Sequence, residues 1–110
     1  MRIAVPIAGG RVSAHFGHCD QFGLFDTEDS EIRGTEYLSP PAHEPGVFPR
    51  WLKEQGADTV ISGGMGRRAQ QLFSDQGIRV EFAAPDGDPE ETVKSYLRGS
   101  LAEGDNRCDH

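Results

Sequence analysis

An almost unbroken apolar segment, RIAVPI at residues 2–7, constrains the fold more than any other part of the sequence. A strand with one face in water alternates apolar and polar side chains, whereas a strand covered on both faces is apolar throughout. We therefore place residues 2–7 at the centre of a sheet that has further layers on its faces. Because the chain has 110 residues, a single domain with one small core is expected.

Other segments predict the strands around this central one. Residues 21–27 and 31–39 are predicted to form an antiparallel hairpin, because only the polar residues 28–30 separate them. Residues 57–62 predict a short buried strand. Residues 78–84 alternate apolar and charged side chains, which is typical of a half-exposed edge strand.

Three helices are predicted from apolar spacing and from their end signals. The first starts at Gly46 and stops at Gly56, and the second runs from the glycine loop at 63–66 to Gly77. The third begins at the cap Asp88, followed by a proline, and its apolar stripe extends to Leu101. The order of strands and helices predicts an α/β fold with a mixed sheet and helices on its faces.

The net charge and the cysteine content limit which classes of function are plausible for this chain. Eleven basic against eighteen acidic residues give a net charge of −7, which opposes nonspecific attraction to nucleic acid or to an anionic membrane. The first apolar segment is too short for a secretory signal or a membrane span, so a cytoplasmic location is expected. There, Cys19 and Cys108 are more plausible as free thiols or metal ligands than as a disulfide.

The stretch AHFGHCDQF, residues 14–22, follows the first strand and is rich in potential metal ligands. His15, His18 and Cys19 are ligand types that bind zinc, copper or iron–sulfur centres. The spacing matches no standard zinc finger, so an ordinary hydrogen-bonded loop remains the alternative. His43 before the first helix is either a further ligand or an exposed loop histidine.

A second loop, SGGMGRR, follows the buried strand at 57–62. Ligands of such sheets bind outside the carboxyl ends of parallel strands, so both loops should meet at one edge. Free N–H groups at Gly64, Met65 and Gly66, together with Arg67 and Arg68, would suit an anion at the start of the helix. The loop is neither a complete dinucleotide fingerprint nor a P-loop, and a plain strand-to-helix turn is the alternative.

Two apolar residues in these loops have two interpretations. Phe16 and Met65 could pack against a bound cofactor, or they could fill the core. We expect core packing for Phe16, and the sequence leaves Met65 undecided. No arrangement of nucleophile and base assigns catalytic roles, so the sequence gives no reason to expect an enzyme.

Three segments together resemble the dinitrogenase iron–molybdenum cofactor biosynthesis family: MRIAVPIAGGRVSAHFGHCDQF, HEPGVFPRWLKEQGADTVISGGMGRRAQQLFSDQGIRV and RGSL. The resemblance implies an RNase H-like three-layer fold, in which a five-stranded mixed sheet with one antiparallel strand is flanked by helices, without nuclease activity. It implies one domain over residues 1–102, followed by a polar tail at 103–110 that we expect to be mobile.

The resemblance also implies where a ligand would bind. The family's histidine in HFG falls on His15, the histidine before the first helix on His43, and the glycine loop on residues 63–66. His18 and Cys19 stand where many relatives have other residues. Small members with similar endings imply a metal role for Cys108 and His110. The predicted cofactor-binding residues are His15, Phe16, Gly17, Gly63, Gly64, Met65, Gly66 and Arg67, and the predicted metal ligands are His15, His18, Cys19, His43, Cys108 and His110.

Three functions therefore remain open from the sequence. The first is a non-catalytic carrier of an iron–sulfur or iron–molybdenum type cluster, or its precursor, that exchanges it with donor and acceptor proteins during cofactor assembly. The second is a module that binds a small anion or responds to a nucleotide. The third is a protein that docks on an assembly partner without a ligand of its own. The oligomeric state is open, although the edge strand at 78–84 would allow pairing.

Overall fold

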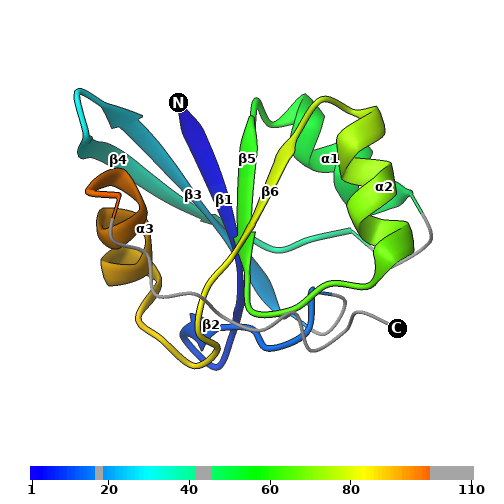
Figure 1. Cartoon of the computed structure of the whole chain (residues 1–110), viewed down its shortest axis with the longest axis horizontal. Coiled ribbons are helices and arrows are strands. Elements are labelled where there is room, and N and C mark those ends of the chain that lie inside the picture. The colour runs from blue at the N-terminus through cyan, green and yellow to red at the C-terminus, as the bar shows by residue number, and fades with distance from the viewer. Residues whose placement is uncertain (17–18, 42–45, 100–110) are drawn as a thin grey trace.

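The computed structural model describes residues 1–16, 19–41 and 46–99 of the chain, drawn in Figure 1. These residues form a mixed α/β fold with one sheet and three helices. The strands are β1 (Arg2–Ala8), β2 (Arg11–Val12), β3 (Gln21–Glu28), β4 (Glu31–Leu38), β5 (Thr59–Ser62) and β6 (Arg79–Phe82). The helices are α1 (Val47–Glu54), α2 (Arg67–Asp75) and α3 (Pro89–Leu97).

The central position predicted for the first strand is confirmed. The main path of the sheet has the order β4-β3-β1-β5-β6, with β1 antiparallel to β3 and parallel to β5. All residues from Ile3 to Ile7 are buried. On this path only β3 runs against the other strands, because β4 is antiparallel to β3 and β6 is parallel to β5.

The expected count of five strands is wrong, because a sixth strand, β2, joins the sheet beside β1. The chain reverses through Gly9 and Gly10, which both have positive φ, and Val12 then pairs with Ile7. This reversal needs a backbone conformation that glycine adopts without strain. A strand of two residues has no periodicity to detect, so the sequence pattern could not reveal it.

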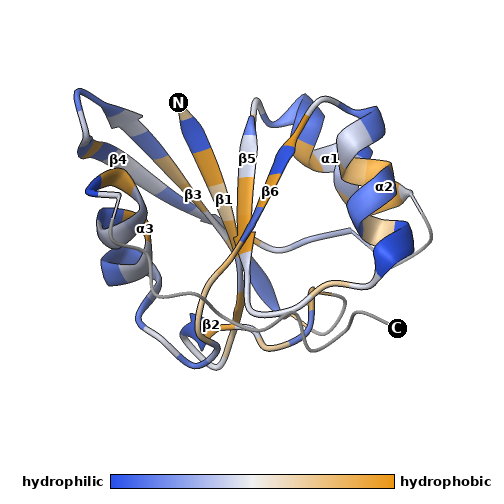
Figure 2. Ribbon diagram, in the orientation of Figure 1, coloured by the Kyte–Doolittle hydropathy of each residue, from blue (hydrophilic) through white to orange (hydrophobic). Residues whose placement is uncertain are grey.

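Helices cover both faces of the sheet, as Figure 1 shows: α1 and α2 lie on one side and α3 on the other. The core accordingly has two parts. Under α1 and α2 the buried cluster is rich in aromatic rings, including Phe16, Phe22, Phe48 and Phe73. Under α3 it is mostly aliphatic, with Val93 of the helix packed among β-strand residues. In Figure 2 the hydrophobic colour concentrates on the central strands.

The helix ends largely follow the predicted stop signals. α1 and α2 are followed by Gly56 and Gly77, whose φ values are 86° and 75°. The third helix is shorter than predicted, because it ends at Leu97 and Gly99 has a φ of 73°. Leu101 lies outside the described residues. None of the described helices is long and apolar enough to cross a membrane.

Candidate binding site at the loop end of the sheet

Two loops lie against each other where β2 and β5 end. The Phe16 N–H donates to the Gly64 carbonyl at 3.0 Å, and the Gly63 N–H donates to the Ser13 carbonyl at 3.1 Å. The prediction that the loops meet at one edge of the sheet is therefore confirmed. We call this region, residues 13–16 and 63–66, the loop end.

Gly63 allows the two loops to approach so closely. A Cβ atom at this position would lie 2.5 Å from the Ser13 carbonyl oxygen and 3.0 Å from the Cα of Ala14. Both neighbours are backbone atoms that cannot rotate away. The absence of a side chain at Gly63 is thus explained by loop packing, without any ligand.

Two buried serines shape the loops in the same way. The Ser13 hydroxyl donates to the His15 carbonyl at 2.7 Å and accepts from the His15 N–H at 3.3 Å. The Ser62 hydroxyl donates to the Gly64 carbonyl at 2.9 Å and accepts from the Gly64 N–H at 3.3 Å. Such local bonds fix a turn just after a strand. Our sequence reasoning missed both serines, although each directly follows a buried β-branched residue.

These bonds correct one expectation about the glycine loop. The Gly64 N–H is not free for an anion, because it donates to the Ser62 hydroxyl. Gly63 and Gly64 are themselves buried. The backbone of Gly64 therefore holds the loops together, and an approaching ligand would meet the chain from Gly66 onward.

The start of α2 has the charge pattern that an anion favours. Its N-cap is Gly66, which provides no capping side chain, and the first turn holds no acidic residue. Arg67 and Arg68 are exposed in that turn. A helix N-terminus carries a partial positive charge and unsatisfied N–H groups. Arginines add to this charge instead of neutralising it.

Phe16 and Met65 belong to the core. Phe16 is 6% exposed and Met65 is 1% exposed. The Phe16 ring lies edge-on to Phe48 and Phe73, with centroid distances of 5.4 and 5.1 Å. The expectation of core packing for Phe16 is confirmed, and the open question for Met65 is answered in the same way. Their side chains anchor the loops and do not present a surface to a cofactor.

His15 and Cys19 differ sharply in their surroundings. His15 is exposed on its turn, whereas Cys19 is partly buried and packs against the aromatic core. The pKa of the Cys19 thiol is raised to about 11, mainly by burial and to a smaller extent by the neighbouring Asp20 charge, while a backbone hydrogen bond acts in the opposite direction. Metals bind the thiolate. Cys19 as placed is thus a poor ligand, and His15 is well placed.

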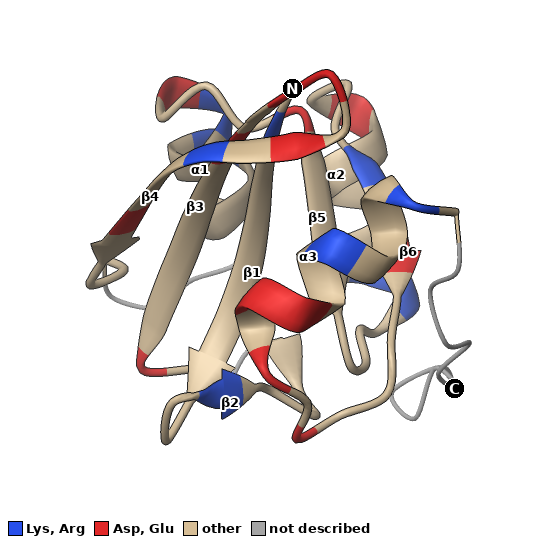
Figure 3. Cartoon of the chain, turned by 90° about the vertical axis from the view of Figure 1, so that its left-hand side faces the viewer, with Lys and Arg blue, Asp and Glu red and all other residues tan. Residues whose placement is uncertain are grey.

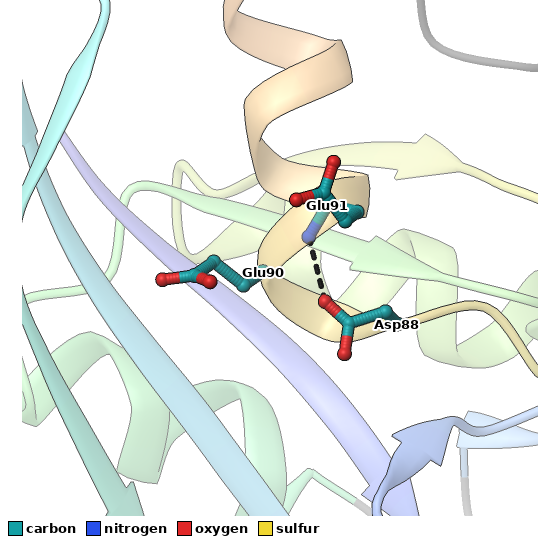
Figure 4. Close-up of side chains that lie close together, drawn as sticks. All are labelled: Asp88, Glu90 and Glu91. Atoms are coloured by element: carbon teal, nitrogen blue, oxygen red, sulfur yellow. Dashed lines mark hydrogen bonds between the residues drawn. The ribbon is translucent and has the colours of Figure 1, made fainter.

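The other predicted site residues are Gly17, His18, His43, Cys108 and His110, which lie outside the described residues. Within the described ranges, one group of three potential ligands gathers within 4.8 Å: Asp88, Glu90 and Glu91. Figure 4 shows that this group forms the start of α3, where Asp88 accepts the Glu91 N–H at 3.0 Å. Helix capping accounts for these carboxylates, so we assign them no metal.

A third loop supports the loop end and was missed by sequence reasoning. The Val12 N–H donates to the Gly87 carbonyl at 2.9 Å, and the Asp86 N–H donates to the Val12 carbonyl at 2.9 Å. Pro85 lies 3.1 Å from the position of a Cβ on Gly63. The signal was present as the turn sequence Pro-Asp-Gly, but nothing in the sequence pairs it with β2.

These features define a small α/β protein in which two interlocked loops carry an exposed imidazole and lead into a helix that starts with two arginines. A sequence model of the family described as dinitrogenase iron-molybdenum cofactor matches residues 1–99. The chain belongs to this family.

Individual relatives agree with this assignment. The uncharacterized protein MJ0580 of Methanocaldococcus jannaschii is 32% identical in an alignment of 106 positions that covers 92% of this chain and 89% of the relative. The crystal structure of PH0822 matches with a TM-score of 0.84 and 32% identity, over 92% of this chain and 94% of that one. The apo form of the orange protein from Desulfovibrio gigas has the same fold, with a TM-score of 0.78 and 24% identity over 96% and 93% of the two chains.

Proposed function

We propose that this protein binds and carries an anionic iron–sulfur or iron–molybdenum type cluster, or its precursor, without catalytic turnover. The observation that carries the proposal is the junction of the two loops. It holds the exposed His15 on a turn that is hydrogen-bonded to the loop opening α2. An imidazole can bind a metal, and the positive end of α2 with its two arginines favours the anionic charge of a cluster.

Family membership supports a role related to cofactor handling. We extend this to cluster donor and acceptor proteins as partners, to a cytoplasmic location and to an RNase H-like arrangement of the layers. The net charge of −7 argues against nucleic acid as a partner.

The donor set supports an exposed, exchangeable site. His15 is exposed at the surface, whereas Cys19 would need to leave the core and lose its proton to become a ligand. A site with few fixed ligands releases its cargo more readily than a closed four-ligand site. This property suits a carrier.

Anaerobic reconstitution tests the proposal. The wild type, His15→Ala and the matched surface variant Thr35→Ala are incubated with iron and sulfide, with and without molybdate, then desalted. We expect retained metal and a visible charge-transfer band in the wild type and in Thr35→Ala, and loss of both in His15→Ala. A colourless, metal-free wild type would contradict the carrier function.

The start of α2 favours a second candidate, a module for a small anion or nucleotide. Its uncapped N-terminus and Arg67 and Arg68 would bind a phosphate without any imidazole. In that case phosphate or nucleotide binding would weaken in Arg67→Ala/Arg68→Ala and persist in His15→Ala. Binding that requires His15 and no arginine would exclude this candidate.

A further inference from the structure

The outer edge of β6 is open among the described residues. β6 is the last strand of the sheet, next to β5. The N–H groups of Arg79 and Ala83 donate to the Asp58 and Ser62 carbonyls, on the β5 side. Because backbone groups alternate along a strand, the N–H and C=O groups of Val80 and Phe82 point away from the sheet. Figure 1 looks onto this edge, and no described helix or strand crosses in front of it.

A groove runs beside this edge, between β6 and α2. Its lining residues are Arg67, Gln70, Gln71, Ser74, Ile78, Arg79 and Val80. Two of them are arginines and none is acidic, although the whole chain carries a charge of −7. The glutamines and the serine add neutral hydrogen-bonding groups. The groove is thus a local basic surface on an acidic protein.

The charge of this groove argues against a second copy of the chain as its occupant. α2 packs against β6 and lies behind it in Figure 3. Two copies joined through β6 would bring two grooves with arginines and no acidic residue together, and like charges oppose such pairing. An extended acidic segment has the complementary charge.

We propose that the β6 edge and the adjoining groove bind an extended acidic segment of another protein. The segment adds as a strand, its backbone pairing with Val80 and Phe82, and the carboxylates on its α2-facing side lie over the groove that Arg67 and Arg79 line. Glu81 is at the alternate position of β6 and is not part of the groove lining, so acidic side chains are required on the α2-facing side alone. Backbone pairing supplies affinity, and the charges select the sequence. The proposal goes beyond cluster binding and needs no metal, so it can fail or hold independently of the proposed function.

The test uses the full chain without metal and two synthetic peptides. One is an acetylated heptapeptide alternating glutamate with threonine, and the other has lysine in place of glutamate. Binding is followed by NMR shifts and by hydrogen exchange of the Val80 and Phe82 amides. We expect the glutamate peptide to shift and protect these amides and to bind at least tenfold more tightly than the lysine peptide. N-methylation of its backbone should abolish the protection.

Charge reversal provides the matched comparison. Arg79→Glu should weaken binding of the glutamate peptide about fivefold or more. Arg33→Glu, an equal change on the opposite edge strand β4, should leave it unchanged.

Four results would overturn the proposal. Equal binding of the two peptides would show that charge does not select the segment. NMR shifts confined to elements other than β6 and α2 would show that the peptide binds elsewhere. Amide protection that rises with protein concentration alone would place a second copy on the edge. Protection that is complete without peptide at any concentration would show that the edge is already covered.

Discussion

The starts of α2 and α3 are built in opposite ways, although both helices follow loops at the same end of the sheet. α3 begins with Asp88, which caps the helix through the Glu91 N–H, and it has Glu90 and Glu91 in its first turn. Figure 3 shows this acidic start on the face covered by α3. The N-cap of α2 is Gly66, which has no capping side chain. The first two residues of the helix are Arg67 and Arg68.

The difference between the two helix starts indicates where an external anion can bind. At α3 the Asp88 carboxylate already accepts the Glu91 N–H, and the negative charges of Asp88, Glu90 and Glu91 interact favourably with the helix dipole. An incoming anion would be repelled there. At α2 the chain supplies no negative charge of its own, and stability comes instead from packing and hydrogen bonds between loops. The candidate site therefore lies at the helix that the sequence leaves uncapped.

The largest effect should come from removing the loop packing under α2. Gly63→Ala would place a Cβ against the Ser13 carbonyl oxygen. We expect a loss of about 2–4 kcal/mol in the free energy of unfolding, because backbone must move. Chemical denaturation measures it, with Gly34→Ala as control, since its nearest atom would be 3.8 Å away. Equal stability of the two variants would show that the loops separate without cost.

Ser62→Ala should have the next largest effect. It leaves the buried Gly64 N–H without its hydroxyl partner, which costs about 1–3 kcal/mol for an unsatisfied buried group. Denaturation compared with Ser74→Ala, at an exposed position of α2, isolates this bond. A loss no greater than that of Ser74→Ala would contradict the role assigned to Ser62.

Asp88→Ala tests the opposite helix start. Loss of the capping carboxylate should destabilise the protein by about 1 kcal/mol, and anion binding at the loop end should not change. The control is Asp75→Ala at the exposed C-terminal end of α2. If Asp88→Ala instead altered reconstitution with iron and sulfide, the acidic group of α3 would have to be reconsidered as a metal site.

Gly66→Asp would give α2 the cap that α3 already has. Gly66 has φ −69° and ψ 159°, which any residue can adopt. We expect a gain of about 0.5 kcal/mol or less in stability, since glycine caps are only slightly worse than aspartate. Binding of the cluster or of phosphate should fall at least tenfold, and titration checks this. Unchanged binding would remove α2 from the site.

The mildest test concerns Cys19 and changes no residue at the loop end. Because its pKa is raised from 9.0 to about 11 in the folded protein, the thiolate is scarce at pH 9. Alkylation there should be roughly fiftyfold slower in the folded than in the denatured Cys108→Ser variant. Since the folded state favours the neutral thiol, this group's contribution to stability is full below pH 9 and is lost as pH rises from 9 to 11. Equal alkylation rates would show an exposed thiolate.

Much of the architecture could be predicted from local patterns. The apolar run of β1, the hairpin of β3 and β4, and the glycines that follow α1 and α2 depend on neighbours in the sequence. The meeting of the two loops also followed, because strand direction decides at which edge a loop emerges. Local signals failed for β2, whose pairing depends on a reversal at two glycines, and for the end of the third helix.

The site was less predictable, for reasons visible in single residues. Phe16 and His15 are adjacent in the sequence, yet one ring lies in the core and the other at the surface. Ser13 and Ser62 were missed because a serine near the end of a strand can bond either to water or to the local backbone, and the sequence does not show which. Cys19 is a possible ligand by residue type, and its packing against the core is the main reason why its pKa is raised.

By itself the sequence determined the order of the elements other than β2, the family and the types of ligand available, since hydrophobic period and residue chemistry are local properties. Only the tertiary structure decided which of these groups reach the surface. It buried Phe16, Met65 and much of Cys19, and it brought Gly63 against Ser13 from fifty residues away. Burial and close approach depend on atoms distant in the chain, so no reading of neighbouring residues can supply them.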